Sequence, residues 1–166
     1  MKTMQRDFQS AYFAGGCFWG VEYCFQGLSG VVATHVGYMG GEAENPTYEQ
    51  VCHGDTGHAE TLEVVFDPKY ISYETLVKHF FEIHDPAQKD RQGPDIGTQY
   101  RSAIFYADYG QKKTAEGVLA LVREKGIDAV TEILPADKFY EAEEGHQRYY
   151  AKKGQVPYCH RRRQIF

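Results

Sequence analysis

The clearest alternation of apolar and polar side chains along the chain runs from His58 to Phe66. Leu62, Val64 and Phe66 fall on one face of this stretch, and Glu60 falls on the same face. A period of two residues predicts a half-buried strand. We expect the carboxyl group of Glu60 to be partly desolvated at the mouth of the apolar face, which raises its pKa. The alternative is that Glu60 lies beyond the buried part of the strand and is solvated.

Apolar residues spaced three and four positions apart predict helices between further strand-like segments. The expected strands span residues 11–14, 30–38, 58–66, 99–106 and 130–134, and the expected helices span 18–28, 72–84, 108–125 and 137–153. Thr47 and Gln50 have the spacing of a capping box, which places Tyr48 in the first turn of another helix. Residues 85–98 form a loop of a length typical of a functional segment. Five short strands covered by helices predict a two-layer sandwich.

The segment Gly15-Gly16-Cys17-Phe18-Trp19-Gly20 lies where the first strand ends and a helix begins. Unpaired backbone N–H groups and the positive end of the helix dipole meet at such a position, and they favour a thiolate over a thiol at Cys17. The glycines leave the sulfur approachable. Trp19, the only tryptophan, points away from the apolar face of the helix and is expected to form a pocket wall. The alternative is that Cys17 is a buried structural cysteine.

Composition limits the classes of protein that fit. The 166 residues suit a single domain spanning 1–166, and 42% hydrophobic with 25% charged residues are typical of a globular protein. No run is apolar enough to span a membrane, and residues 1–7 lack the apolar core of a signal peptide, so a cytoplasmic location is expected. Reduced or redox-active cysteines are then expected rather than structural disulfides. Outside the basic segment 152–166 the chain has 13 basic and 23 acidic side chains, which argues against a nucleic-acid surface.

Three kinds of chemistry fit a reactive cysteine. A papain-like hydrolase would pair Cys17 with His146, which follows 129 residues later, but the residues around the cysteine differ and no asparagine follows the histidine. A metal-binding module would use Cys52, His53 and His58, with Cys24 also available, although their spacing matches no common zinc site. Thiol redox catalysis needs a thiolate, a proton donor, hydrogen-bond donors and a second thiol, all of which the chain can supply.

Several blocks of the sequence together resemble the peptide methionine sulfoxide reductase A family. The blocks are Gly15-Gly16-Cys17-Phe18-Trp19-Gly20, Asn45-Pro46-Thr47-Tyr48-Glu49, Gly57-His58-Ala59-Glu60, Asp95-Ile96-Gly97-Thr98-Gln99-Tyr100-Arg101-Ser102 and, more weakly, Glu143-Glu144-Gly145-His146-Gln147. The resemblance covers roughly residues 10–153. It implies reduction of methionine S-sulfoxide, free or in proteins, by a cysteine thiolate through a sulfenic acid and then a disulfide, which repairs oxidised proteins. It also implies an α+β two-layer sandwich with a mixed sheet and a ferredoxin-like core.

The resemblance implies a role for each matching residue. Cys17 would attack the sulfoxide sulfur, and protonated Glu60 would donate its proton to the sulfoxide oxygen. Tyr48 and Tyr100 would hydrogen-bond that oxygen, because tyrosine hydroxyls are neutral donors at pH 7. The substrate-binding residues would be Phe18 and Trp19 around the methyl group, Asp95, which arranges the site, and His146 nearby. No cofactor and no metal are expected, thioredoxin is the implied electron donor, and the chain is expected to be a monomer.

Cys159 is the expected second thiol, which resolves the sulfenic acid on Cys17. Cys24 follows seven residues later on the same helix, about 10 Å along its axis. A disulfide needs about 4.4–6.8 Å between Cα atoms, so Cys24 cannot reach. Cys52 lies one helical turn after Tyr48 and is a stronger competitor, but its packing on that helix would restrict its movement.

Residues 154–166 are expected to form a mobile tail that carries Cys159, because a glycine and a proline interrupt the chain there. His160 and the run Arg161-Arg162-Arg163 would favour the thiolate of Cys159. The tail departs from the family pattern, since no further cysteine follows and a third, relay thiol is absent.

Overall fold

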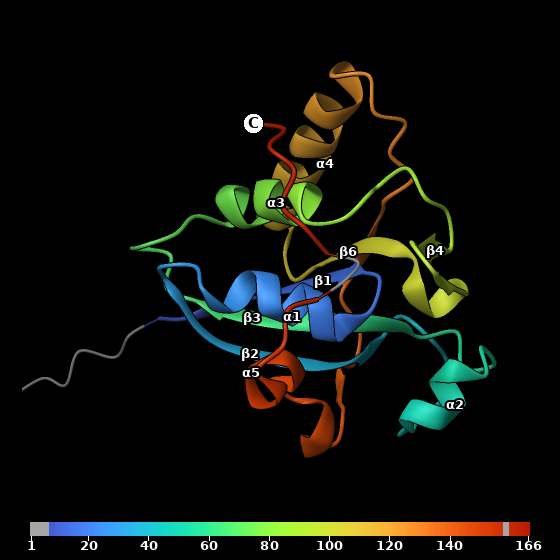
Figure 1. The fold of residues 1–166 in the computed structure, drawn as a ribbon. Helices are drawn as coiled ribbons and strands as arrows, with labels where there is room; N and C mark the ends of the chain where they lie inside the picture. Colours follow the sequence, from blue (N-terminus) through green and yellow to red (C-terminus); the bar gives the residue numbers. More distant parts are fainter. Residues whose placement is uncertain (1–6, 158–159) are drawn as a thin grey trace, which may run out of the picture.

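The computed structural model describes residues 7–157 and 160–166. Its centre is a six-stranded sheet with the spatial order β7-β6-β1-β3-β2-β8. The strands β6, β1, β3 and β2 are labelled in Figure 1. The strands are β1 (Gln9–Gly15), β2 (Val31–Met39), β3 (Ala59–Phe66), β6 (Ser102–Tyr106), β7 (Glu132–Pro135) and β8 (Tyr140–Glu141). Each neighbouring pair is antiparallel except β6 and β7, which are parallel, so the sheet is mixed.

The helices α1 (Phe18–Gln26), α3 (Tyr73–Glu82) and α4 (Tyr109–Glu124) contribute side chains to one large apolar core together with the sheet. Figure 1 shows α3 and α4 above the sheet. Stacked aromatic rings, including Phe13, Phe25 and Phe80, lie at the centre of this core. The opposite face of the sheet carries a smaller apolar cluster. The chain also forms two short helices, α2 (Tyr48–Cys52) and α5 (Tyr149–Lys153). It has two 3₁₀ turns, η1 (Thr98–Tyr100) and η2 (Glu144–His146).

The order of elements confirms the expected fold class. The elements β1, α1, β2, β3, α3 and β6 follow the β-α-β-β-α-β sequence of ferredoxin-like folds, and their strands lie in the order β6-β1-β3-β2. The strands β7 and β8 extend this core at its two edges. The chain is therefore an α+β two-layer sandwich with a mixed sheet and a ferredoxin-like core.

The strand expected from the alternation, β3, lies between β1 and β2 at the centre of the sheet. Leu62 lies opposite Phe13 of β1, and Glu60 lies opposite Tyr38 of β2. Glu60 is only 1% exposed, as buried as the apolar residues that share its face. The central position confirms the desolvated carboxyl group, and the solvated alternative is wrong.

The prediction of one continuous helix over residues 137–153 is wrong. Tyr140 pairs with Tyr38 in the short strand β8, and the turn η2 and the helix α5 follow. Arg148 has a left-handed backbone, with φ 52° and ψ 41°, which a continuous right-handed helix cannot contain. The apolar residues of this segment have the spacing of one helix, but in the structure they belong to separate short elements.

Two further boundaries differ from the expected ones. The loop over residues 85–98 contains a small hairpin formed by β4 (Arg91–Gln92) and β5 (Asp95–Ile96). The strand expected over 99–106 begins at Ser102, because the preceding residues form the turn η1. Strands of two residues are too short for an alternating pattern to indicate them.

The described part of the tail, residues 160–166, makes specific contacts with the domain, whereas a mobile tail was expected. Glu82 at the end of α3 accepts the backbone N–H groups of Ile165 at 2.8 Å and Phe166 at 3.3 Å, and its backbone carbonyl accepts that of Arg163 at 2.7 Å. His160 is 3% exposed. These partners lie about 80 residues or more from the tail in the sequence, so no local pattern indicates them.

Candidate active site

Cys17 is the residue that caps the N-terminus of α1, directly after β1. It is 9% exposed, and the backbone N–H groups of Trp19 and Gly20 hydrogen-bond toward its sulfur. The glycines around it admit side chains from other parts of the chain. Gly16 has φ +98°, and an added Cβ there would lie 2.7 Å from the side chain of Gln92. At Gly20 an added Cβ would collide with the ring of His160, so these glycines allow close packing around the cysteine.

The protonation of Cys17 differs from the expectation. Burial raises the pKa of the Cys17 thiol, and the nearby charge of Glu60 raises it further. The N–H groups of Trp19 and Gly20 lower the pKa, as expected at a helix start, but the effect of burial is larger. The resting form of Cys17 at neutral pH is therefore the thiol, and the thiolate must form during the reaction.

Glu60 lies beside this thiol with one oxygen unpaired. Its Oε1 accepts the backbone N–H of Phe18 at 3.2 Å, whereas its buried Oε2 has no hydrogen-bond partner among the described residues. Burial raises the pKa of Glu60 to about 8, and the charge of Asp95 adds to the rise against the opposing N–H of Phe18. Glu60 can therefore hold a proton at neutral pH and donate it from a desolvated position.

Three tyrosines supply neutral hydroxyl groups near Glu60. Burial raises the pKa of Tyr48 and Tyr100, and the charge of Glu60 raises each further, so both stay protonated. The capping box of Thr47 and Gln50 is confirmed, and it places Tyr48 at the start of α2.

Sequence reasoning missed the third tyrosine, Tyr38, which is fully buried opposite Glu60 with its hydroxyl group unpaired among the described residues. The ring of Tyr38 lies 5.7 Å from that of Phe18. Its position two residues after Val36 on the inward face of an expected strand could have indicated it.

Trp19 forms one wall of an aromatic group next to Cys17. Its indole Nε1–H donates to Nδ1 of His146 at 3.3 Å, and its ring stacks on Tyr149 with centroids 3.9 Å apart. The rings of Tyr48 and Phe18 lie 6.0 Å and 6.4 Å from it. Burial lowers the pKa of His146, so a neutral ring accepts the indole N–H. Tyr149 was not expected here, because the segment was expected to be part of a continuous helix.

The remaining candidates are placed as follows. The charge of Asp95, on β5, raises the pKa of both Glu60 and Cys17, so Asp95 lies near enough to act on both groups electrostatically. Cys52 is exposed at the end of α2 and hydrogen-bonds with Tyr48. Cys159 lies outside the described residues. Its neighbour His160 donates from Nε2 to the carbonyl oxygen of Gly15 at 2.8 Å. Burial lowers the pKa of His160, so it is neutral and does not supply the positive charge expected from it.

The two other chemistries find no support in this geometry. His146 accepts the indole N–H of Trp19, and its Nε2 lies 3.5 Å from a carboxylate oxygen of Glu143. No hydrogen bond in the described parts of the chain joins His146 to Cys17 as a hydrolase would require. Over residues 7–157 and 160–166, no group of three or more potential ligands is placed to hold a metal ion. In the same residues no helix is long and apolar enough to cross a membrane.

Comparison with known proteins identifies the family. The sequence model described as peptide methionine sulfoxide reductase matches residues 9–166. The peptide methionine sulfoxide reductase MsrA of Methanosarcina acetivorans is 54% identical over 149 residues, which cover 88% of this chain and 79% of the relative. The crystal structure of reduced Mxr1 from Saccharomyces cerevisiae superimposes with a TM-score of 0.90 at 37% identity and covers 98% of both chains. The same yeast protein in complex with Trx2 superimposes with a TM-score of 0.67 at 28% identity, over 98% of this chain and 97% of the other. The chain therefore belongs to the peptide methionine sulfoxide reductase family, whose members reduce methionine sulfoxide to methionine.

Proposed function

We propose that this reductase acts on the S epimer of methionine sulfoxide, free or within proteins, with Cys17 as nucleophile and Glu60 as general acid. The observation that carries the proposal is the buried carboxyl group of Glu60, which has one unpaired oxygen and a pKa of about 8 beside a buried thiol. A sulfoxide oxygen leaves sulfur only when it is protonated, and a carboxylic acid that remains protonated at neutral pH can supply that proton.

The proposed first step moves one oxygen atom and two electrons. The sulfur of Cys17 attacks the sulfoxide sulfur while Glu60 gives its proton to the sulfoxide oxygen, and Glu60 recovers a proton from the thiol. In the resulting adduct the two sulfurs are bonded and the oxygen is protonated. As the adduct collapses, the oxygen passes to the Cys17 sulfur, the bond between the two sulfurs and the substrate sulfur–oxygen bond break, methionine leaves, and Cys17 carries the oxygen as a sulfenic acid. The cysteine sulfur is thereby oxidised by two electrons and the methionine sulfur is reduced by two. The hydroxyl groups of Tyr48 and Tyr100 donate hydrogen bonds to the oxygen during the transfer.

Substrate recognition is proposed to depend on a small part of the ligand. Phe18 and Trp19 contact the methyl group. Asp95 helps to arrange the site, and His146 lies beside Trp19. The aromatic rings around Trp19 provide an apolar surface beside the polar group formed by Glu60 and the tyrosines. A ligand held by its sulfoxide and methyl groups alone can be free methionine sulfoxide or a residue of a peptide.

Turnover of each pure epimer with dithiothreitol tests this function. We expect the S epimer of methionine sulfoxide to be converted to methionine, and the R epimer to be left unchanged, because a site with fixed donors and a fixed methyl pocket accepts one arrangement around sulfur. The measurement is methionine formed over time by chromatography. Equal turnover of both epimers, or turnover of neither, would contradict the proposal. Peptide hydrolysis by the same sample would instead favour the cysteine hydrolase.

Cys159 is proposed to resolve the sulfenic acid by forming a disulfide with Cys17. In support, the next residue, His160, packs against Gly20 and bonds to Gly15, on the two sides of Cys17. Cys24 lies seven residues along the same helix as Cys17, and Cys52 is exposed on α2 beside Tyr48.

We expect peptide mapping after one equivalent of substrate to find a Cys17–Cys159 disulfide in the wild-type protein. In the Cys159→Ser variant the oxidised Cys17 should persist, and turnover with thioredoxin should fall about tenfold or more, because the tethered thiol is present at an effective concentration up to about millimolar. A Cys52→Ser variant is the matched control and should behave as wild type. Normal turnover and a disulfide in Cys159→Ser protein would assign the role to Cys52.

The reductant is proposed to be thioredoxin, which exchanges its dithiol with the disulfide and returns Cys17 to the thiol. The support is the structural likeness to the yeast relative that forms a complex with Trx2. We further propose that the chain works as a monomer in the cytoplasm, where a thioredoxin system keeps thiols reduced.

A further inference from the structure

The segment that carries His146 and Tyr149 has little regular structure of its own. It consists of the two-residue strand β8, the three-residue turn η2 and the five-residue helix α5. Both rings nevertheless contact Trp19 closely, one by a hydrogen bond and one by stacking. Their positions therefore depend on contacts that the segment makes with the rest of the domain, and two buried polar side chains provide those contacts.

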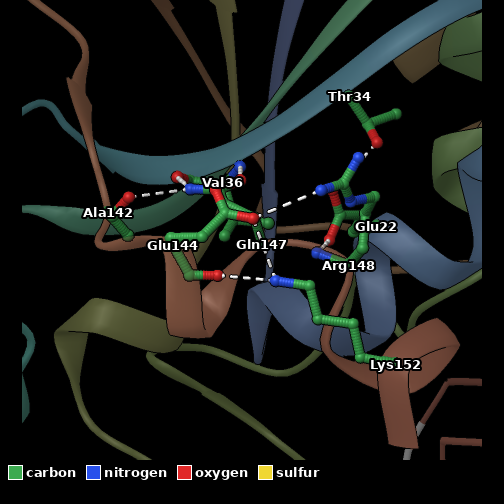
Figure 2. Close-up of polar contacts among 8 residues, drawn as sticks. All are labelled: Glu22, Thr34, Val36, Ala142, Glu144, Gln147, Arg148 and Lys152. Atoms are coloured by element: carbon green, nitrogen blue, oxygen red, sulfur yellow. Dashed lines mark hydrogen bonds and ion pairs between the residues drawn. The ribbon is translucent and has the colours of Figure 1, made fainter.

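The first of these side chains is Gln147, which is 4% exposed. Its Oε1 accepts the backbone N–H of Val36 at 2.8 Å, and its Nε2 donates to the carbonyl oxygens of Val36 and Ala142, each at 2.9 Å (Figure 2). Beyond the end of β8, the side-chain amide of Gln147 therefore makes the hydrogen bonds to β2 that the backbone of a longer strand would make. This fixes the chain immediately after His146.

The second is Glu22, which is 1% exposed and lies three residues after Trp19 on α1. Its Oε1 accepts the backbone N–H of Arg148 at 2.6 Å, and its Oε2 accepts the hydroxyl group of Thr34 at 2.8 Å (Figure 2). The left-handed backbone of Arg148 is unfavourable for a residue with a Cβ, and the hydrogen bond that its N–H donates to Glu22 offsets the cost of this bend. The same helix therefore carries the indole ring and the carboxylate that holds the opposing rings.

An exposed layer of charged side chains lies outside these buried bonds. Glu144 contacts Arg148 at 3.2 Å and Lys152 at 3.0 Å, and its side chain is 75% exposed (Figure 2). Exposed ion pairs contribute little to stability, because water competes with each partner. The buried pair Glu22 and Gln147, which we call the clamp, is therefore the part that fixes the segment.

We infer that Glu22 and Gln147 are positioning residues for substrate binding, because the clamp holds His146 and Tyr149 against Trp19 and so sets the width of the pocket for the substrate methyl group. The inference rests on the proposed role of Trp19 as a wall of that pocket. It goes beyond the catalytic group, since neither side chain contacts Cys17 or Glu60 through any hydrogen bond in the described parts of the chain.

The test compares Glu22→Met, which has a similar length but no oxygen acceptor, with Glu22→Gln. In Glu22→Met protein we expect KM for the S epimer to rise about tenfold, the ratio that corresponds to about 1.4 kcal/mol, while kcat changes less than about twofold. A change in KM alone indicates lost binding that the ground state and transition state share. Glu22→Gln should restore wild-type KM, because its amide oxygen can accept the Arg148 N–H and its amino group can donate to Thr34. Lys152→Ala, in the exposed layer, should leave both constants unchanged.

Fluorescence without substrate separates the clamp from the catalytic proposal, because Trp19 is the only tryptophan of the chain. Loss of the stacked tyrosine exposes the indole to water, so the emission of Glu22→Met protein should shift to longer wavelength and that of Glu22→Gln should not. Unchanged emission, or shifted emission with unchanged KM, would contradict the inference while leaving Cys17 and Glu60 unaffected. A fall in kcat at constant KM would contradict it too. Should Glu22→Met fail to fold, Gln147→Glu carries the same expectations, because it keeps the bond from Val36 N–H and loses both donors.

Discussion

Replacement of Cys17 by serine should abolish the reduction of methionine sulfoxide, with a loss in rate of at least about 10⁴-fold, as found when a catalytic nucleophile is removed. A serine hydroxyl is far less nucleophilic than a thiol and forms neither a sulfenic acid nor a disulfide. The fold should persist, because the substitution changes one atom and a serine hydroxyl oxygen can accept the same backbone N–H groups of Trp19 and Gly20 that point toward the Cys17 sulfur. The rate is measured as methionine formed in a single turnover with the S epimer and dithiothreitol.

The matched control for this variant is Cys24→Ser, which makes the same chemical change on the same helix. We expect its activity to equal that of the wild-type protein. Methionine formation by the Cys17→Ser variant at more than about one hundredth of the wild-type rate would remove the cysteine from the role of nucleophile.

The second large effect is expected for Glu60→Gln. The amide keeps the size of the side chain but cannot donate an acidic proton, so the chemical step should slow by about 10²- to 10⁴-fold, the usual range for general acid–base catalysis. KM should change little, because the methyl pocket is formed by other residues. Single-turnover measurements at saturating substrate isolate the chemical step. An unchanged single-turnover rate would exclude Glu60 from the mechanism.

The pH dependence of the wild-type chemical step gives an independent view of Glu60. Its pKa of about 8 means that the required acid form predominates below that pH and is lost above it. The single-turnover rate should therefore be level at neutral pH and fall through about pH 8, and this fall should be absent in Glu60→Gln. A reaction limited by formation of the Cys17 thiolate would rise with pH over the same range, so the sign of the change distinguishes the two.

The parts of the site that local patterns encode could be predicted from the sequence. The alternation over residues 58–66 indicates a buried Glu60 because a central strand is desolvated along one whole face. The capping box places Tyr48 because the hydrogen bonds that start α2 involve residues three apart. Cys17 lies at a helix start because a glycine with positive φ and an amphipathic segment flank it.

The parts that depend on distant partners could not be predicted in this way. Tyr149 contacts Trp19 only because a left-handed residue and the buried Glu22 bend the chain there, and Glu22 is 126 residues away. The tail is held by Glu82, which is more than 80 residues from its end. The pKa of Cys17 was expected to fall because the helix start is visible in the sequence, whereas the burial that raises it becomes visible only in the folded chain.

The most direct test of Cys17 as the oxygen acceptor is one turnover of the Cys159→Ser protein with one equivalent of the S epimer, followed by trapping with dimedone. We expect one methionine for each enzyme molecule and an equal amount of dimedone adduct, located on Cys17 by peptide mapping. Methionine formed without an adduct on Cys17, or an adduct found on Cys24 or Cys52 in its place, would contradict the central claim that Cys17 accepts the oxygen.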